Sequence, residues 1–400
     1  MTLAGGRAVL ASTAVSYAGQ VAGIAIGLLV AGRAGAEARG EYAVGLVALE
    51  LGYGVIAGAV AESATFHARS ERGRVDNGTA TLAVALLPLG VVACVVAGLL
   101  PLPDGYVLPL CAYFLTASLV RMPALARTEV GLLDGGVYAA ALHYAGGSVV
   151  ALLVVASSLV VDGELSGAWV LGAVVGASIL VDVVRLVVTF DRPRLRPDRE
   201  MARRIYGYAL RLAPAQWASF LNLKVDIVLL TLFVPVSDIG VYAVAVTLIR
   251  APHAVYLQAA RLFVPMESSA VARLRRPIAL VVALSTAYLA LLVLVGAPLL
   301  VRWLGSEFDD LPLLCLVLAP GAIALGPYTL HSRLASSWGF ARALRVTEIV
   351  GLVVALAGLL VLAPLLGVVG AAVASSATYV LRLALLQRRV FRGGSNRSQD

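Results

Sequence analysis

The sequence predicts an all-α integral membrane protein of about twelve transmembrane helices, arranged as two six-helix lobes related by a pseudo-twofold axis along the membrane normal. An apolar composition, a series of long apolar stretches and a repeat over half the chain predict this fold. Of the 400 residues, 60% are hydrophobic and 14% are charged, whereas soluble proteins are about 45–50% apolar and about 25% charged. The composition excludes a soluble globular protein or a disordered chain. The net charge of +8 is therefore interpreted as a topology signal, and no nucleic-acid partner is expected.

Twelve apolar stretches are long enough for a membrane helix, which needs about 20 apolar residues. They lie at 8–30, 41–63, 79–100, 106–126, 131–160, 167–190, 206–234, 240–262, 278–300, 311–330, 345–363 and 367–387. The stretches are continuous, whereas strands of a membrane β-barrel alternate in polarity over about ten residues. The first stretch is too long for the apolar part of a signal peptide, so we interpret it as an uncleaved span.

The basic residues alternate between the two sides of the predicted membrane. The N-terminus, the even-numbered loops and the tail hold 22 arginines, and the odd-numbered loops hold three: Arg33, Arg39 and Arg302. Cytoplasmic loops carry an excess of Lys and Arg, so we expect both termini in the cytoplasm and the protein in the plasma (inner) membrane. The predicted domains are an N-terminal lobe (1–190), a basic cytoplasmic linker (191–205), a C-terminal lobe (206–390) and a cytoplasmic tail (391–400).

A short motif recurs at half the chain length. Residues 40–44 read Gly-Glu-Tyr-Ala-Val, and residues 240–244 read Gly-Val-Tyr-Ala-Val. Four of the five positions match at an offset of 200, and both copies open a helix that runs inward. Parallel repeats of this kind are related by an axis along the membrane normal, with the transport site between them. The other interpretation is a common turn and helix start, in which Tyr serves as an interfacial anchor.

Three parts of the chain carry a family resemblance. They are residues 28–43, which end Arg39-Gly40-Glu41-Tyr42-Ala43; residues 222–226 with 240–245; and residues 300–308 with Pro320-Gly321 and residues 367–372. In order and spacing they resemble the polysaccharide-transporter, O-antigen flippase-like branch of the multidrug/oligosaccharidyl-lipid/polysaccharide exporter superfamily. The resemblance covers most of the chain.

The resemblance implies a two-lobed bundle that moves polyprenyl-diphosphate-linked oligosaccharide from the inner to the outer leaflet by alternating access, for cell-surface polysaccharide synthesis. Membrane lipids, a polysaccharide polymerase and glycosyltransferases are the partners it implies. The chain departs from the drug-exporter branch, because its first span contains Gln20 and no acid.

Three cations in or near the predicted spans are candidates for binding a diphosphate. Lys224 is the single lysine and lies in the seventh span, with Arg211 nearer its cytoplasmic end. Arg250 lies about ten residues into the eighth span, roughly 15 Å deep. Ionisable groups inside a bilayer are costly and face a cavity or a partner, and Arg binds phosphate oxygens in pairs. Arg211 has a second interpretation, as a side chain that reaches the interface.

Five other polar residues are candidates for ion coupling or for lining the cavity: Asp226, Glu50, Asn222, His253 and His143. Asn222 and Asp226 are four residues apart and share a helix face. Glu50 precedes Arg250 by 200 residues, which suggests an ion pair between them or separate pairs within each lobe. A lone buried His is commonly a hydrogen-bonded core residue, and proton coupling is the other interpretation.

Two further pairs are predicted from spacing alone. Asp182 with Arg185, and Arg345 with Glu348, are each three residues apart on a helix. We interpret the first as a structural pair near the inner end of a helix and the second as a surface pair.

Other functions are weighed against transport of a lipid-linked sugar. An ion-coupled drug or cation antiporter would need an acidic cavity, and a membrane glycosyltransferase or ligase would need catalytic acids beside a large outer loop. A scaffold without transport activity would have its buried charges paired.

Cys94, Cys111 and Cys315 lie singly within spans, so no metal site is expected. We expect no enzyme activity and no cofactor, with Na⁺ or H⁺ as the coupling ion.

Overall fold

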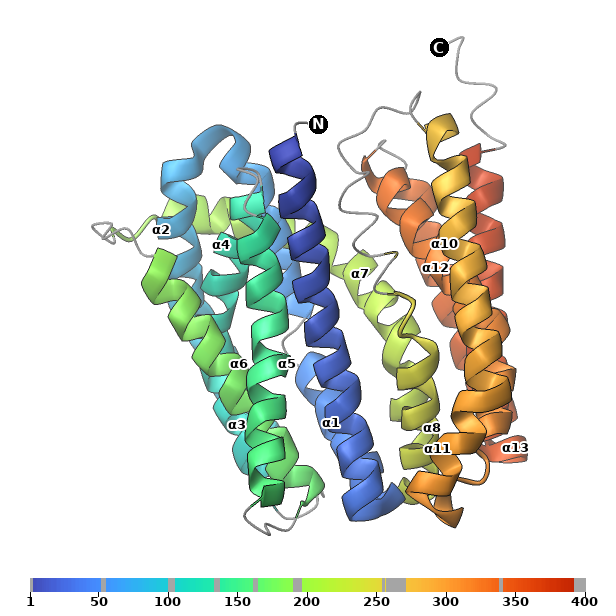
Figure 1. Cartoon of the computed structure of the whole chain (residues 1–400). Coiled ribbons are helices and arrows are strands. Elements are labelled where there is room, and N and C mark those ends of the chain that lie inside the picture. Colours follow the sequence, from blue (N-terminus) through green and yellow to red (C-terminus); the bar gives the residue numbers. More distant parts are fainter. Residues whose placement is uncertain are drawn as a thin grey trace. The chain divides into compact units, whose positions relative to one another are not determined.

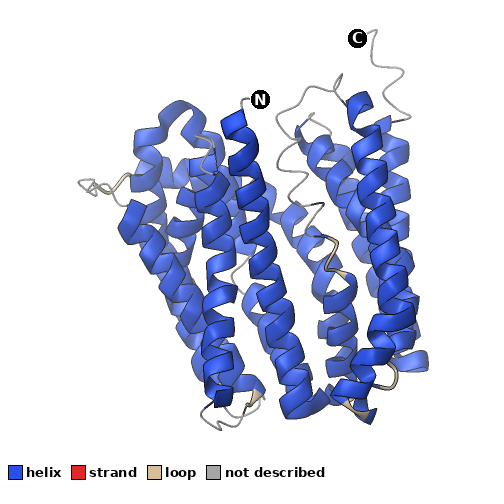
Figure 2. Ribbon diagram, in the orientation of Figure 1, coloured by secondary structure: helices blue, strands red, loops and turns tan. Residues whose placement is uncertain are grey.

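The computed structural model describes residues 3–51, 55–99, 105–132, 137–160, 165–189, 196–253, 256, 271–337 and 341–391. Within these residues the regular secondary structure is helical, with no strand (Figure 2). The α-helices are α1 (Leu3–Leu49), α2 (Val55–Leu99), α3 (Val107–Thr116), α4 (Met122–Leu132), α5 (Val137–Val160), α6 (Gly167–Thr189), α7 (Arg199–Leu230), α8 (Val236–Ile249), α10 (Val271–Leu291), α11 (Ala297–Leu304), α12 (Leu311–Ser337) and α13 (Ala341–Phe391). Short π-helical turns at Ala117–Arg121 and Leu292–Gly296 join α3 to α4 and α10 to α11.

Three long helices each contain a break in the backbone. The breaks lie at Gly35 in α1 (φ 83°), at Glu71 in α2 (φ −135°, ψ 47°) and at Gly367 in α13 (φ 58°). Each falls between two predicted spans or at the boundary of one. Glycine tolerates the positive φ at two of these breaks because it has no Cβ.

The helical segments on either side of the breaks match the twelve predicted spans. The second span is covered by the end of α1 and the start of α2, and α13 supplies the eleventh and twelfth spans. In the eighth predicted span, helix α8 ends at Ile249 and residues 250–252 form a turn. Beyond residue 253, Tyr256 is the one described residue of that span. Eight helices of the described part are long and apolar enough to cross a membrane.

The distribution of side chains is that of a multi-pass membrane protein. Large apolar side chains are exposed on the outer helix faces, among them Leu108 (78%) and Val188 (76%). Several ionisable side chains are instead buried, among them Arg382 and Asp226. Because lipid replaces water around such helices, apolar groups face outward and the costly polar groups face inward.

The chain forms two compact units. The first comprises Met1–Ala34 and Glu41–Phe220, and the second comprises Gly35–Gly40 and Leu221–Asp400. The division falls inside α7, six residues after Pro214, and α7 begins within the predicted linker at Arg199. In the first unit α2 packs against α3 and α4, and α5 against α6; in the second, α12 packs against α13 and α8 (Figure 1).

The repeated motif produces a close backbone crossing in the second unit. A Cβ atom added to Gly240 would lie 1.8 Å from the carbonyl oxygen of Ala36, and one added to Gly40 would lie 2.0 Å from that of Val236. The two contacts are reciprocal at the offset of 200, since 36 corresponds to 236 and 40 to 240. Only glycine lets the two backbones approach this closely.

Two side chains hold the Gly35–Gly40 segment in the second unit. The Glu307 carboxylate accepts the N–H of Ala36 at 2.9 Å, directly after the break at Gly35. Arg39 is buried and donates to the hydroxyl of Thr247 at 3.1 Å and to the carbonyl oxygen of Ala243 at 3.4 Å. A segment from the first half of the sequence is therefore an integral part of the second unit.

Candidate functional site

A buried polar network runs through the second unit, and Asp226 is at one end of it. The Asp226 Oδ2 atom accepts hydrogen bonds from the hydroxyls of Tyr242 (2.6 Å) and Ser375 (3.2 Å). Arg250 places Nη2 3.9 Å from the same oxygen and donates from Nη2 to the Tyr379 hydroxyl at 2.6 Å. Residues from α7, α8 and α13 thus meet around one carboxylate.

Glu348 is at the other end of the network. Its Oε2 atom pairs with Nη2 of Arg382 at 2.5 Å, and its Oε1 atom accepts from the Tyr328 hydroxyl at 2.6 Å. The Asn222 amide donates to the Glu348 carboxylate and backbone carbonyl, at 3.0 and 2.9 Å. The Tyr379 hydroxyl donates to the carbonyl oxygen of Asn222 at 3.3 Å, which joins the two ends.

Helical spacing accounts for the way the network is assembled. Asn222 and Asp226 lie one turn apart on α7, and both are buried. Ser375, Tyr379 and Arg382 follow at intervals of four and three residues on α13, so they share one helix face. Apolar residues between them keep the same helices compatible with the membrane.

The network contains two acids and two guanidinium groups, so its formal charges balance. Burying one charge without a partner costs several kcal/mol, and a pair needs further hydrogen bonds to offset desolvation. Arg382 is 1% exposed, pairs with Glu348 at 2.5 Å and lies over the Tyr328 ring at 4.3 Å. The Arg250 side chain is 18% exposed, and its contact with Asp226, at 3.9 Å, is the longer of the two ion pairs. Arg250 is the network cation best placed to change partners.

The structure brings together some of the predicted site residues. Asp226 and Arg250 meet directly, and Asn222 joins them through Tyr379. Lys224, between Asn222 and Asp226 on α7, is half-buried rather than buried with them. His253 is half-buried, with Nδ1 3.4 Å from the Thr329 hydroxyl.

The other predicted residues lie in the first unit. Arg211 is exposed on the first part of α7, and Glu50 is half-buried at the end of α1. Arg250 pairs within its own unit, with Asp226, which is the second of the two alternatives for Glu50 and Arg250. His143 is buried, and its Nε2 atom lies 3.3 Å from Asp182.

Two predicted ion pairs are wrong. Asp182 pairs with Arg121 at 3.3 Å and with His143, whereas Arg185 donates to the Thr128 hydroxyl. Glu348 is not a surface residue: it is 3% exposed and pairs with Arg382, while Arg345 is exposed. In both cases a buried acid pairs with a cation from a more distant helical segment, because desolvation makes a full partner necessary.

Sequence reasoning missed most of the side chains that complete the network: Tyr242, Tyr328, Ser375 and Tyr379. The signal available was the polar face of the last span, which recurs at positions 375, 379 and 382 within an apolar run. A polar residue repeated at helical spacing in a membrane helix points to a buried network.

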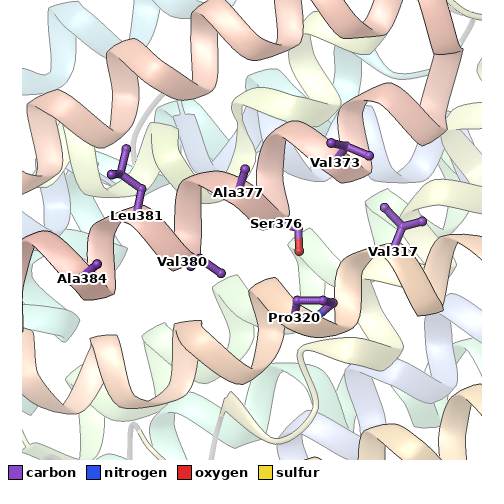
Figure 3. A pocket seen from close by; sticks show the side chains of 8 residues that line it. All are labelled: Val317, Pro320, Val373, Ser376, Ala377, Val380, Leu381 and Ala384. Carbon is purple, nitrogen blue, oxygen red and sulfur yellow. The ribbon is translucent and has the colours of Figure 1, made fainter.

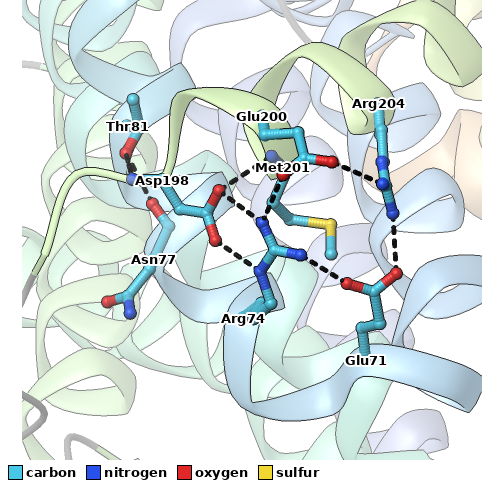
Figure 4. A network of polar contacts seen from close by, with 8 residues as sticks. All are labelled: Glu71, Arg74, Asn77, Thr81, Asp198, Glu200, Met201 and Arg204. Carbon is cyan, nitrogen blue, oxygen red and sulfur yellow. Dashed lines mark hydrogen bonds and ion pairs between the residues drawn. The ribbon is translucent and has the colours of Figure 1, made fainter.

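A second, exposed network fixes the start of α7 in the first unit (Figure 4). Arg74 bonds Asp198 through Nε (2.8 Å) and Nη2 (3.0 Å), and contacts Glu71 and Glu200. Arg204 bonds the same two glutamates. Asp198 also accepts the N–H of residue 201, capping α7, and the hydrogen bond from Arg74 lowers the pKa of Asp198. The network ties the break at Glu71 to the first turn of α7.

Comparison with solved structures shows which known proteins share the fold of this chain. The lipid II flippase MurJ, in an inward closed conformation, is similar with a TM-score of 0.70 and 10% identity, over 95% of this chain and 87% of that one. The chain has the fold of the MOP transporter superfamily. The MATE multidrug transporter DinF-BH, in complex with R6G, has a TM-score of 0.68 at 15% identity, covering 96% of this chain and 94% of that chain.

A third similar structure is a MATE family transporter of the MOP superfamily in an inward-facing conformation. It has a TM-score of 0.65 at 15% identity, covering 98% of this chain and all of that chain. No protein-family model matches the sequence, and no curated protein matches it. The TM-scores show that this chain shares the fold of these three transporters.

Proposed function

We propose that the protein is a flippase that moves polyprenyl-diphosphate-linked oligosaccharide from the inner to the outer leaflet, for cell-surface polysaccharide synthesis. It works by alternating access in the plasma (inner) membrane, with both termini in the cytoplasm. The observation that carries the proposal is Arg250, a cation whose side chain is 18% exposed and forms a long ion pair in a buried network, in a fold shared with a lipid II flippase. Glycosyltransferases and a polysaccharide polymerase are its proposed partners, together with membrane lipids.

The geometry around Arg250 suits reversible binding of a diphosphate. Tyr379 orients the guanidinium through a short hydrogen bond, while the contact with Asp226 is long. An incoming phosphate can replace Asp226 and form a paired contact with the guanidinium. Release then returns Arg250 to Asp226, which limits the affinity for the product. Lys224, half-buried on the neighbouring α7, supplies a second cation, and Arg211 contacts the headgroup first.

The ion that drives transport is proposed to act at the acids of the spans. When phosphate holds Arg250, the Asp226 carboxylate loses its cation and can accept Na⁺ or H⁺. Glu50 is the corresponding candidate in the first unit. His143 and His253 have hydrogen-bonding partners in the structure and are proposed to support their units.

The second candidate function is an ion-coupled drug or cation antiporter. It is favoured by the multidrug transporters among the similar structures. A cationic substrate, however, requires acids without resident cations, and the acids of the described network are matched by Arg250 and Arg382. A membrane glycosyltransferase or ligase is a third alternative, and the similar structures do not favour it.

The test is translocation of a lipid-linked oligosaccharide in liposomes by Arg250→Ala, Lys224→Ala and the double variant. Each should elute and give a helical circular dichroism spectrum like the wild type, and translocate at least tenfold more slowly. Arg302→Ala is the matched control, because Arg302 is an exposed arginine of the same unit. Wild-type transport by the double variant would remove both residues from the mechanism.

A further inference from the structure

An apolar groove lies between α12 and the second part of α13, in the second unit (Figure 3). Val317 and Pro320 form one wall, and α13 residues from Val373 to Ala384 form the other. Its volume is about 560 Å³. Since a cavity of about 150 Å³ holds benzene, this space corresponds to roughly twenty carbon atoms.

The backbone gives the groove its shape. A Cβ atom added to Gly321 would lie 2.6 Å from Cα of Ser376, so α12 and α13 touch at that level. Pro320, directly before this contact, removes a helical hydrogen bond and favours a bend in α12. Beyond the contact, Ala377 and Ala384 leave room that larger side chains would fill. The groove is therefore built into the helix packing and does not depend on side-chain rotation.

The lining restricts the ligand to hydrocarbon. Seven of its eight side chains are apolar, and the hydroxyl of Ser376 already accepts the N–H of Gly321 at 2.7 Å. A polar group placed in the groove would lose its hydrogen bonds to water and gain none. Both helices belong to segments apolar enough to cross a membrane, so the occupant comes from the bilayer.

A positive charge continues the groove along α13. Val373, Ala377, Val380 and Ala384 are exposed and recur at intervals of three or four residues, which places them on one helix face. Arg388 follows Ala384 by four residues on that face and is also exposed. Arg388 therefore lies about 6 Å beyond the groove along the helix. The nearer Arg382 is buried and paired with Glu348, so it does not serve the groove.

We propose that this groove binds the phosphate-proximal isoprene units of the polyprenyl chain, with Arg388 beside the diphosphate before translocation. This inference rests on the proposed function, because the flippase must hold a chain that stays in the bilayer while its headgroup crosses. From Val373 to Ala384 the groove is about 16 Å long. A polyprenyl diphosphate has both groups that this site can bind: a hydrocarbon chain for the groove and an anionic diphosphate for Arg388.

A photocrosslinking amino acid at Val380 tests the site in proteoliposomes of phosphatidylethanolamine and phosphatidylglycerol that contain undecaprenyl diphosphate. The matched control position is Val353, an exposed valine of α13 outside the groove. We expect the polyprenyl probe to be captured about tenfold more at Val380 than at Val353. Ala377→Phe fills the groove and Arg388→Gln removes the charge, and each should reduce capture about tenfold. A helical spectrum and elution like the wild type show that both variants fold.

Capture of phospholipid at both positions, with no preference for the polyprenyl probe, would overturn the inference. That result in a protein that still translocates lipid-linked oligosaccharide would leave the proposed function standing. Selective capture at Val380 in a protein that translocates nothing would support the groove and contradict the proposed function.

Discussion

Substitution of Gly240 by alanine perturbs the closest backbone contact that the repeated motif makes. The added Cβ would lie 1.8 Å from the carbonyl oxygen of Ala36 and close to the backbone of Gly40. The obstacle is backbone rather than the end of a flexible side chain, so the two helical segments must separate. Overpacking of this kind costs about 1–3 kcal/mol or more. Because the obstacle is backbone, the cost lies at the upper end of this range. After subtraction of the roughly 1 kcal/mol that alanine gains in a helix, we expect Gly240→Ala to lower stability by about 2 kcal/mol.

The matched control is Gly207→Ala. Gly207 is also helical, on α7, but nothing lies within 4 Å of an added Cβ. Here only the helix propensity changes, so stability should rise by about 0.5–1 kcal/mol. Gly40→Ala should behave like Gly240→Ala because its contact with Val236 is the reciprocal one. The double variant should lose less than the sum, since one substitution already separates the helices.

The assay is the midpoint of thermal unfolding of the purified proteins in detergent, at one heating rate. At about 2–4 °C per kcal/mol, the Gly240 and Gly207 variants should shift in opposite directions. Equal shifts, or a stabilised Gly240→Ala protein, would refute the close crossing and with it the structural meaning of the repeat.

Two further predictions concern the polar networks. Glu348→Ala or Arg382→Ala leaves a buried charge without its partner and should cost about 3–5 kcal/mol of stability, measured by unfolding in SDS; an additive loss in the double variant would contradict the pairing. The pKa of Asp198 is lower in the folded protein than in the unfolded chain, where it is about 4. Asp198 therefore stabilises the fold fully above about pH 4, and this stabilisation is lost as the pH falls through the folded pKa. Asp198→Asn keeps the helix cap and should flatten the fall in melting midpoint below pH 4. An unchanged pH profile would count against the network with Arg74.

The spans were predictable because bilayer thickness sets the length of an apolar run independently of neighbouring helices. The breaks at Gly35 and Gly367 fall where one apolar run ends and the next begins. The spans and the breaks depend on residues close together in sequence. The recurrence of the motif was also visible in the sequence, but the close crossing at Gly40 and Gly240 was not, because it joins segments 200 residues apart.

The partners of buried charges were not predictable from the same information. Spacing along one helix favoured Arg185 for Asp182, but the structure selects Arg121 from another helix. An i,i+3 pair on a helix surface contributes only about 0.2–0.5 kcal/mol, whereas a buried acid without a partner costs far more. The choice is therefore made by tertiary packing, which sequence spacing does not encode.

The site around Arg250 was also predictable only in part from the sequence. The choice of Arg250 as a candidate cation followed from the sequence, and so did the shared face of Asn222 and Asp226. The link through Tyr379 did not, because it joins α13 to a residue of α7 that lies 157 positions earlier. The candidate site was thus predicted in part. Glu348 was interpreted as a surface residue, and the hydroxyls that orient the charges were missed.

The most direct test of the proposed function is the location of lipid-linked oligosaccharide in a strain that lacks the gene. Intact and permeabilised cells are treated with a membrane-impermeant reagent that labels the glycan, so that each leaflet is measured. We predict that lipid-linked oligosaccharide accumulates on the inner leaflet, and that outer-leaflet label returns when the wild-type gene, but not Arg250→Ala, is restored. An unchanged distribution between the leaflets in the deletion strain would contradict the claim that this protein is the flippase.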